Sequence, residues 1–222
     1  LVVTSCSKYR YEEVADDPLH SRIYTLDNGL KVYMTVNGEA PRIQTYIAVR
    51  VGSKNDPLET TGLAHYFEHL MFKGTKSFGT QDYEAERPML DEIERLFEVY
   101  RTTTDADERR AIYARIDSVS QEASKLAIPN EYDKLMSAIG AAGTNAFTSY
   151  DMTVYTEEIP SNQIDNWAKI QSDRFANAVI RGFHTELETV YEEYNMSLTS
   201  DSRKMLDSLM VALYPHLSLI HI

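Results

Sequence analysis

Cysteine is nearly absent from this chain, which has one, Cys6, among 222 residues. A single cysteine forms no internal disulfide and cannot build a cysteine-rich zinc site. A metal ion in this protein must therefore be held by histidine, aspartate or glutamate. The length is that of one generous domain, or of one domain with an insertion, and it is sufficient to bury a full hydrophobic core without disulfide bonds.

Positive charge is also scarce, and long apolar runs are missing. The chain has 22 lysines and arginines against 34 aspartates and glutamates, which gives a formal net charge of -12. Binding to a phosphate backbone needs basic patches, so nucleic acid is not an expected partner. No apolar run approaches the ~20 residues of a membrane-spanning helix, which excludes such a helix from the sequence shown.

Both ends of the chain carry features that a folded domain does not need. Small residues precede Cys6, as at the cleavage site of a bacterial lipoprotein. On this interpretation residues 1–17 are a signal remnant and a tether, Cys6 is lipidated, and the protein is attached to a membrane of the bacterial cell envelope as a periplasmic or outer-membrane lipoprotein. The alternative is a frayed terminus with a chance cysteine. Residues 217–222 match a sequencing adapter read through as protein, which predicts a truncated chain with a non-native tail.

Two regions of the sequence show the pattern of strands. Residues 22–51 alternate apolar and polar side chains with a period of two, which is typical of strands with one buried face. Asn28 and Gly29, between the first two runs, are a strong hairpin signal. We expect three strands of one sheet in this region and two further strands at residues 143–149 and 152–157.

The remaining segments show helical spacing. A first helix is expected at residues 60–72, ended by Gly74. Residues 84–125 have helical spacing with a polar break, which predicts a helical hairpin on the domain surface. Because strands and helices do not alternate strictly, the pattern indicates an α+β domain. Three further helices are expected, at residues 131–139, at residues 160–175 and, as one long helix, from a capping box at residues 185–188 onward.

The first helix contains the motif H-x-x-E-H, formed by His65, Glu68 and His69. Residues four apart lie one above the other on a helix, so the two imidazoles can bind one Zn²⁺. Glu68 lies on the same stripe and can accept a proton from the attacking water instead of binding the metal. Neighbouring apolar residues place this helix in the core, where unpaired polar side chains are costly.

A catalytic zinc ion needs a third protein ligand, and the last helix offers one. Glu186 and Glu193 are seven residues apart and return to nearly the same helix face, whereas Glu188 and Glu192 point elsewhere. One carboxylate can bind the metal while the other orients a histidine. The spacing leaves open which does which, and acidic residues at a helix start also suit the helix dipole.

The H-x-x-E-H motif, taken together with residues 183–193, resembles the insulinase- and pitrilysin-like zinc metallopeptidases of family M16. The resemblance covers roughly residues 22–214. It implies a LuxS/MPP-like metallohydrolase domain at residues 18–222, in which a mixed, mainly antiparallel sheet packs against helices. The stretch between His69 and Glu193 is longer than in compact family members, and an inserted helical hairpin at residues 84–125 accounts for the difference.

The same resemblance implies roles for individual residues. One Zn²⁺ per domain would be bound by His65, His69 and Glu193, with Glu68 as general base and Glu186 as the acid that orients a ligand. Residues 143–149 resemble the edge strand that pairs with the substrate backbone, and this strand contains Asn145, Ala146, Phe147 and Thr148.

The implied function is that of a zinc endopeptidase that hydrolyses unfolded peptides or small proteins with a metal-activated water. Its partners would be the peptide substrate and either the C-terminal half of the same enzyme or a partner subunit, so the chain alone would be inactive or weak. The alternative is a non-catalytic M16-like scaffold or binding subunit, against which the complete set of site residues counts. The segments Lys73-Gly74-Thr75 and Gly140-x-x-Gly143 lack the spacing of a nucleotide-binding loop.

Overall fold

The computed structural model describes residues 10–214 and divides them into two compact units, one ending at Pro41 and one beginning at Arg42. Cys6 and residues 217–222, which carry the lipidation and tail predictions, lie outside the described residues. None of the helices in the described range is long and apolar enough to cross a membrane.

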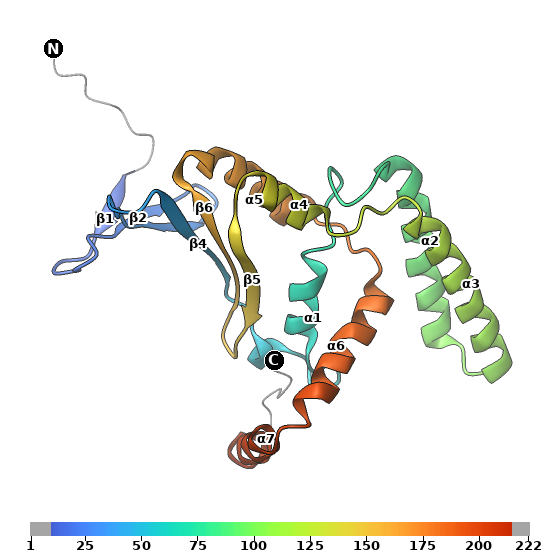
Figure 1. The fold of residues 1–222 in the computed structure, drawn as a ribbon. Helices are drawn as coiled ribbons and strands as arrows, with labels where there is room; N and C mark the ends of the chain where they lie inside the picture. Colours follow the sequence, from blue (N-terminus) through green and yellow to red (C-terminus); the bar gives the residue numbers. More distant parts are fainter. Residues whose placement is uncertain (1–9, 215–222) are drawn as a thin grey trace. The chain divides into compact units, whose positions relative to one another are not determined.

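The first unit is a three-stranded antiparallel sheet of β1 (Tyr11–Glu13), β2 (Arg22–Thr25) and β3 (Lys31–Met34), in that order (Figure 1). Gly29, with φ of 85°, turns the chain between β2 and β3, which confirms the expected hairpin. Strand β1 lies inside residues 1–17, which we expected to be a signal remnant and a tether. Its sequence does not alternate, and it is ordered by backbone pairing with β2, which a polarity pattern does not reveal.

The second unit contains a separate antiparallel sheet of β4 (Arg42–Val49), β6 (Thr153–Pro160) and β5 (Ala142–Thr148), in the spatial order β4-β6-β5. The expectation of one sheet across residues 22–51 is therefore wrong. Strand β4 pairs over its whole length with β6, far along the chain. Alternation shows which face of a strand is buried but not which strand lies beside it. The two strands expected after residue 142 are confirmed.

Two helices, α4 (Glu131–Ala138) and α5 (Ile164–Asn177), pack near this sheet and confirm the helices expected there. A short 3-10 turn, η2 (Ser161–Gln163), precedes α5, and another, η1 (Ser53–Asn55), follows β4. The apolar core between helices and sheet is formed by buried side chains of the second unit, namely Phe78, Tyr132, Met136 and Ile159.

Helix α1 (Leu63–Leu70) contacts β5, β6 and the later helix α6 (Phe183–Ser197). In Figure 1 it lies between β5 and α6. The helix begins later than expected because the Asp56 carboxylate accepts hydrogen bonds from the N–H groups of Gly62 and Ala64, at 2.8 and 2.9 Å, and so caps it from outside.

The helical hairpin expected at residues 84–125 is confirmed. It consists of α2 (Tyr83–Thr102) and α3 (Ala106–Ser124), capped by Asp82 and Asp105. The hairpin has its own apolar core, and Phe183 at the start of α6 packs against it. The buried residues of that core are Ile93, Leu96, Ile116, Val119 and Ala123.

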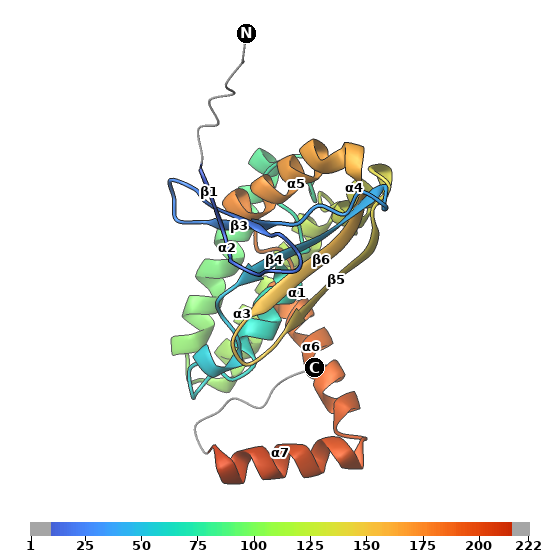
Figure 2. The same cartoon turned by 90° about the vertical axis from the view of Figure 1, so that its left-hand side faces the viewer.

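The single long helix expected from residue 185 is wrong in two respects. Helix α6 begins at Phe183, after Gly182 with φ of 56°, and the Thr185 hydroxyl donates to the Gly182 carbonyl rather than forming a capping box. The helix then ends at Ser197, and Ser200 caps a separate helix, α7 (Asp201–Leu213). Figure 2 shows α7 running across the direction of α6.

Candidate metal centre

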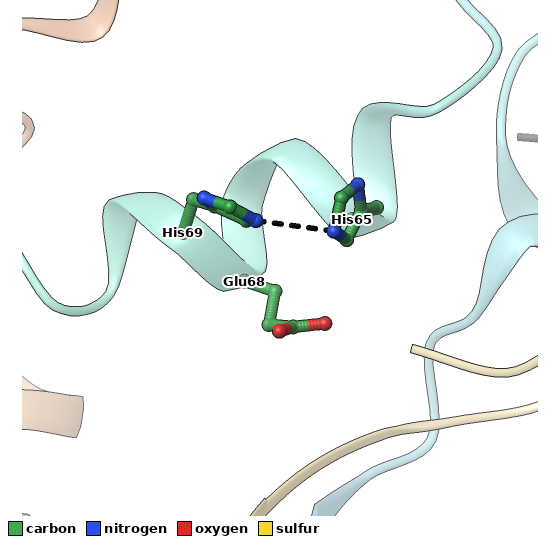
Figure 3. A group of neighbouring side chains, drawn as sticks. All are labelled: His65, Glu68 and His69. Carbon is green, nitrogen blue, oxygen red and sulfur yellow. Dashed lines mark hydrogen bonds between the residues drawn. The ribbon is translucent and has the colours of Figure 1, made fainter. Parts of the chain in front are cut away.

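The two histidines of α1 point to one place. Their Nε2 atoms are 3.1 Å apart, and Glu68 extends from the same side of the helix (Figure 3). His65 and Glu68 are buried, at 5% and 7% exposure. The structure therefore brings together the three residues of the H-x-x-E-H motif, and one ligand atom from each lies within 4.8 Å of the others.

Helix α6 is held against α1 by a hydrogen bond one residue from His65. The Tyr66 hydroxyl donates to the backbone carbonyl of Phe183 at 2.5 Å. Burial, reinforced by the Glu186 carboxylate, raises the pKa of Tyr66 to about 12, so the hydroxyl keeps its proton near neutral pH. This contact fixes the start of α6 and hence the positions of the carboxylates that follow it.

Glu186, in the first turn of α6, lies against His69. Its Oε1 is 2.9 Å from His69 Nδ1. A carboxylate can only accept here, so the hydrogen-bond network assigns the imidazole proton to Nδ1 and leaves a lone pair on Nε2. That lone pair faces His65 Nε2. An Nδ1–H donated to a carboxylate is the usual arrangement of a histidine that binds a metal ion.

Glu193 lies two turns further along α6 and completes a set of three donors. Its Oε2 is 3.4 Å from His69 Nε2 and 4.0 Å from His65 Nε2. Ligand atoms placed 2.0–2.1 Å from a tetrahedral zinc ion lie about 3.3 Å from one another. Distances of 3.1, 3.4 and 4.0 Å between the three donor atoms are close to this value. Two imidazoles and one carboxylate at this spacing fit Zn²⁺.

Glu68 has a different environment from Glu193. The Thr148 hydroxyl donates to Glu68 Oε2, which engages one oxygen of the carboxylate. Burial raises the pKa of the Glu68 carboxyl above its usual value, and the hydrogen bond from Thr148 partly opposes this rise. A buried carboxylate with a raised pKa beside a metal-binding set is suited to accepting a proton.

Lys73, three residues beyond the end of α1, is a member of the site that the sequence did not reveal. Its ammonium forms an ion pair with Oε2 of Glu186. Burial alone would raise the pKa of Glu186, but the hydrogen bonds and charges of Lys73 and His69 outweigh it and hold the pKa below its usual value. No spacing rule links the two residues, because they meet only through the packing of α6 on α1.

A pocket of about 470 Å³ surrounds these groups. Asn145, Ala146 and Phe147 of β5, which the resemblance assigns to a substrate-pairing strand, line it together with Phe72 and Asp133. Thr148 is not among the lining residues, because it is buried behind Glu68. In the described part of the chain β5 pairs only with β6, so it is the edge strand beside α1.

The other two carboxylates considered on α6 lie away from the pocket. Glu188 and Glu192 border a separate shallow depression together with Leu187 and Tyr191. This agrees with the helical-wheel argument that separated them from Glu186 and Glu193. The site thus uses one face of α6 and one face of α1.

The H-x-x-E-H order in α1 is that of the inverted zincins, and α1 contacts the edge strand β5 of an α+β domain. The model of the insulinase family, peptidase family M16, matches residues 31–94. Protease 3 of Escherichia coli (strain K12) is 30% identical over 114 residues, which are 51% of this chain and 10% of that protein. Insulin-degrading enzyme of Drosophila melanogaster is 34% identical over 67 residues, 30% of this chain and 7% of that enzyme.

The fold agrees with these sequence similarities. The crystal structure of pitrilysin superposes with a TM-score of 0.61 at 18% identity, covering 96% of this chain and 18% of that one. The chain is similar in sequence to the insulinase family, peptidase family M16, over residues 31–94, and its fold is similar to that of pitrilysin. Its matches to the curated relatives named here span about a tenth of their lengths or less.

Proposed function

We propose that this chain carries the metal centre of a zinc-dependent endopeptidase that cleaves unfolded peptides or small proteins. The observation that carries the proposal is the convergence of three donor atoms, from His65, His69 and Glu193, with a buried carboxylate beside them. The similarity of residues 31–94 to a peptidase family supports the same reaction class.

Each residue of the site has a chemical task in this proposal. His65, His69 and Glu193 would hold Zn²⁺, which when bound supplies Lewis acidity for the scissile carbonyl and lowers the pKa of a water molecule. The Glu68 carboxylate accepts a proton from the attacking water and delivers it to the leaving amine. Thr148 fixes the orientation of Glu68 through its hydroxyl. No covalent intermediate with the protein is needed.

The edge strand provides a place for the substrate. Strand β5 borders the pocket with Asn145, Ala146 and Phe147, and its outer edge can pair with an extended peptide as an added strand. Backbone pairing of this kind is tolerant of sequence and favours unfolded segments. We propose that the substrate chain lies along β5, with the scissile bond near the histidines.

Two further parts of the proposal concern the parent protein. Because the chain corresponds to a small share of its relatives, we propose that a C-terminal half or a partner subunit closes over the pocket and helps to bind substrate. The lipidation of Cys6 and a location in the bacterial envelope stay predictions, which metabolic labelling with a radioactive fatty acid would test by comparing wild type with Cys6→Ser.

The test of the proposed function is metal content followed by peptide cleavage. The purified chain should contain about one zinc ion, His65→Ala and His69→Ala should lose it, and His20→Ala, at an exposed histidine of the first unit, should retain it. The parent protein should cleave an internally quenched unstructured peptide, stop when a chelator is added and recover with zinc. A chain without zinc at neutral pH would contradict the metal centre. A zinc-loaded parent without hydrolysis would favour the non-catalytic scaffold.

A further inference from the structure

Among the described residues that line the pocket, Lys73 is the one lysine or arginine. It lies three residues after the end of α1, its side chain is 34% exposed, and its ammonium contacts Glu186 Oε2. The other oxygen of the same carboxylate contacts His69 Nδ1 at 2.9 Å. Lys73, Glu186 and His69 therefore form a continuous chain of contacts that ends at Nδ1 of the imidazole whose Nε2 is the proposed metal donor.

The backbone that presents Lys73 is held rigidly. Gly74 has φ of 107°, and a Cβ at this position would lie 2.5 Å from the Phe78 carbonyl oxygen, so only glycine fits the turn. Arg181 donates to the carbonyl groups of Lys73 and Thr75, at 3.4 and 2.7 Å. The backbone position from which the Lys73 side chain reaches Glu186 is thus fixed.

Arg181 is itself anchored away from the pocket. Its Nε lies 2.8 Å from Glu86 Oε1 on α2, and both side chains are buried. Arg181 directly precedes Gly182, the N-cap of α6. Its contacts therefore connect the turn after α1, the hairpin and the start of α6. The same framework therefore positions both Lys73 and the helix that carries Glu186.

Charge explains why a cation is needed at this place. Glu68, Glu186 and Glu193 lie around one pocket. Glu186 is only 12% exposed, so water cannot compensate its charge well, and leaving this buried carboxylate without a cation would be costly. A lysine on the far oxygen neutralises Glu186 and holds it in place.

We infer that Lys73 is a positioning residue that acts through Glu186 to keep His69 oriented, with its proton on Nδ1 and its Nε2 lone pair directed at the metal position. This inference rests on the proposed function for its consequence, which is zinc affinity. The geometric part concerns only the protein's own side chains. The Lys73-Gly74-Thr75 segment, whose spacing does not fit nucleotide binding, would on this inference support the metal centre.

The first experiment measures the zinc dissociation constant of the intact chain by competition with a chelating indicator. Lys73→Met should weaken binding about 10-fold, within the range known for residues that orient a metal ligand. Lys73→Arg should restore most of the affinity, because it keeps the charge. Lys76→Met, at an exposed lysine of the same turn, should change nothing. Lys73→Gln is a second neutral variant in case the methionine disturbs folding.

A double-mutant cycle shows whether Lys73 acts through Glu186. In a Glu186→Gln background, Lys73→Met should cause no further loss of affinity, because the carboxylate on which it acts has gone. An equal loss in both backgrounds would overturn the inference. An unchanged zinc affinity with a raised KM in the parent protein would also overturn it, because Lys73 would then act on the substrate.

The second experiment needs neither zinc nor peptidase activity. Imidazole ¹⁵N spectra of the metal-free chain should show His69 with its proton on Nδ1, and Lys73→Met should move it to a mixture of the two tautomers. An unchanged tautomer in that variant would overturn the inference even if the chain binds zinc. Conversely, a chain that binds no zinc but shows the tautomer change would refute the proposed function and leave the positioning role supported.

Discussion

Glu68 and Glu193 are both carboxylates beside the same two histidines, yet their surroundings differ. Glu68 comes from α1, is buried and accepts a hydrogen bond from Thr148. Glu193 comes from α6, is 37% exposed and places its Oε2 within 3.4 Å of His69 Nε2. A buried carboxylate that accepts a hydrogen bond from a hydroxyl, as Glu68 does, is suited to proton transfer. A carboxylate whose oxygen lies near the Nε2 atoms of two imidazoles, as that of Glu193 does, is suited to binding a cation.

Replacing Glu68 by glutamine should separate chemistry from metal binding. The amide is nearly isosteric and can keep the contact with Thr148, but it cannot accept the proton. We expect Glu68→Gln in the parent protein to retain zinc and lower kcat about 10²- to 10⁴-fold. Steady-state turnover of a fluorogenic peptide, with zinc content measured on the same sample, checks this. Near-normal turnover would remove Glu68 from the role of base, and Glu192→Gln, outside the pocket, is the matched control.

The two carboxylates of α6 should differ in their effect on the metal. Glu193→Ala removes a proposed ligand, whereas Glu186→Ala removes a partner that orients His69 and should cost about 10- to 100-fold in zinc affinity. We therefore expect the Glu193 variant to bind zinc more weakly than the Glu186 variant. Zinc titration ranks them, with Glu192→Ala as the control on the same helix. The opposite ranking would exchange the two roles.

At the scale of elements, the site depends on how α6 packs against α1 on one side and the hairpin on the other. The Tyr66 hydroxyl joins α6 to α1, and Phe183 joins it to the hairpin core. His184, in the first turn of α6, lies against Phe97 of α2, with ring centroids 5.7 Å apart. The hairpin thus supports the helix that carries Glu186 and Glu193, although α6 lies far from it in the sequence.

The half-buried His184 makes the packing of α6 against the hairpin dependent on pH. Burial lowers the pKa of His184 below its usual value of about 6.5, although the charges of Asp117 and Glu188 partly oppose this. The folded state therefore prefers neutral His184. Its contribution to stability is fully present above pH ~6.5 and is lost as the pH falls through the lower pKa of the folded state.

Urea unfolding of the metal-free chain at pH 7.5 and 5.5 measures this contribution. We expect the wild type to lose more unfolding free energy on acidification than His184→Phe, which keeps the aromatic packing without the titration. His20→Gln, at an exposed histidine, should behave like the wild type. If the wild type and His184→Phe lose the same unfolding free energy, this histidine does not make the packing of α6 against the hairpin dependent on pH.

At the scale of the whole molecule, the proposed ligands all lie within one unit while much apolar surface stays open. Helix α7 has no buried residue, and Met205 and Leu206 on it are 72% and 49% exposed. Tyr191 on α6 is 62% exposed. Apolar surface of this extent is typical of a face that another part of a protein covers.

The chain by itself should therefore bind about one zinc ion but cleave peptides poorly or not at all. The donor atoms are present, but substrate positioning against β5 would lack the opposing part, and such positioning can contribute ~7 kcal/mol or more to lowering a barrier. Zinc stoichiometry and fluorogenic-peptide turnover, on the chain alone and after mixing with the remainder of the parent protein, check this. Full activity of the chain alone would contradict the need for a second part.

Local interactions account for what could be predicted from the sequence. The spacing of His65, Glu68 and His69 places them on one helix face whatever the surroundings, because helix geometry is set by neighbouring residues. The same holds for the hairpin of α2 and α3 and for the turn at Gly29. The starts of α1 and α6 were predicted less well, since Asp56 caps α1 from outside the helix and Gly182 precedes α6 ahead of the expected capping box.

Contacts between distant segments were decided only by the tertiary structure. Alternation in β4 did not show that its neighbour is β6 rather than β3, because periodicity reports a buried face and not a partner. The ion pair between Lys73 and Glu186 and the hydrogen bond from Thr148 to Glu68 likewise join residues far apart in the chain. The amino-acid sequence alone thus determines which chemical groups each helix and strand can offer, since that depends on local geometry. Their assembly into one site is decided by the packing of α1 against β5 and α6, which depends on long-range burial.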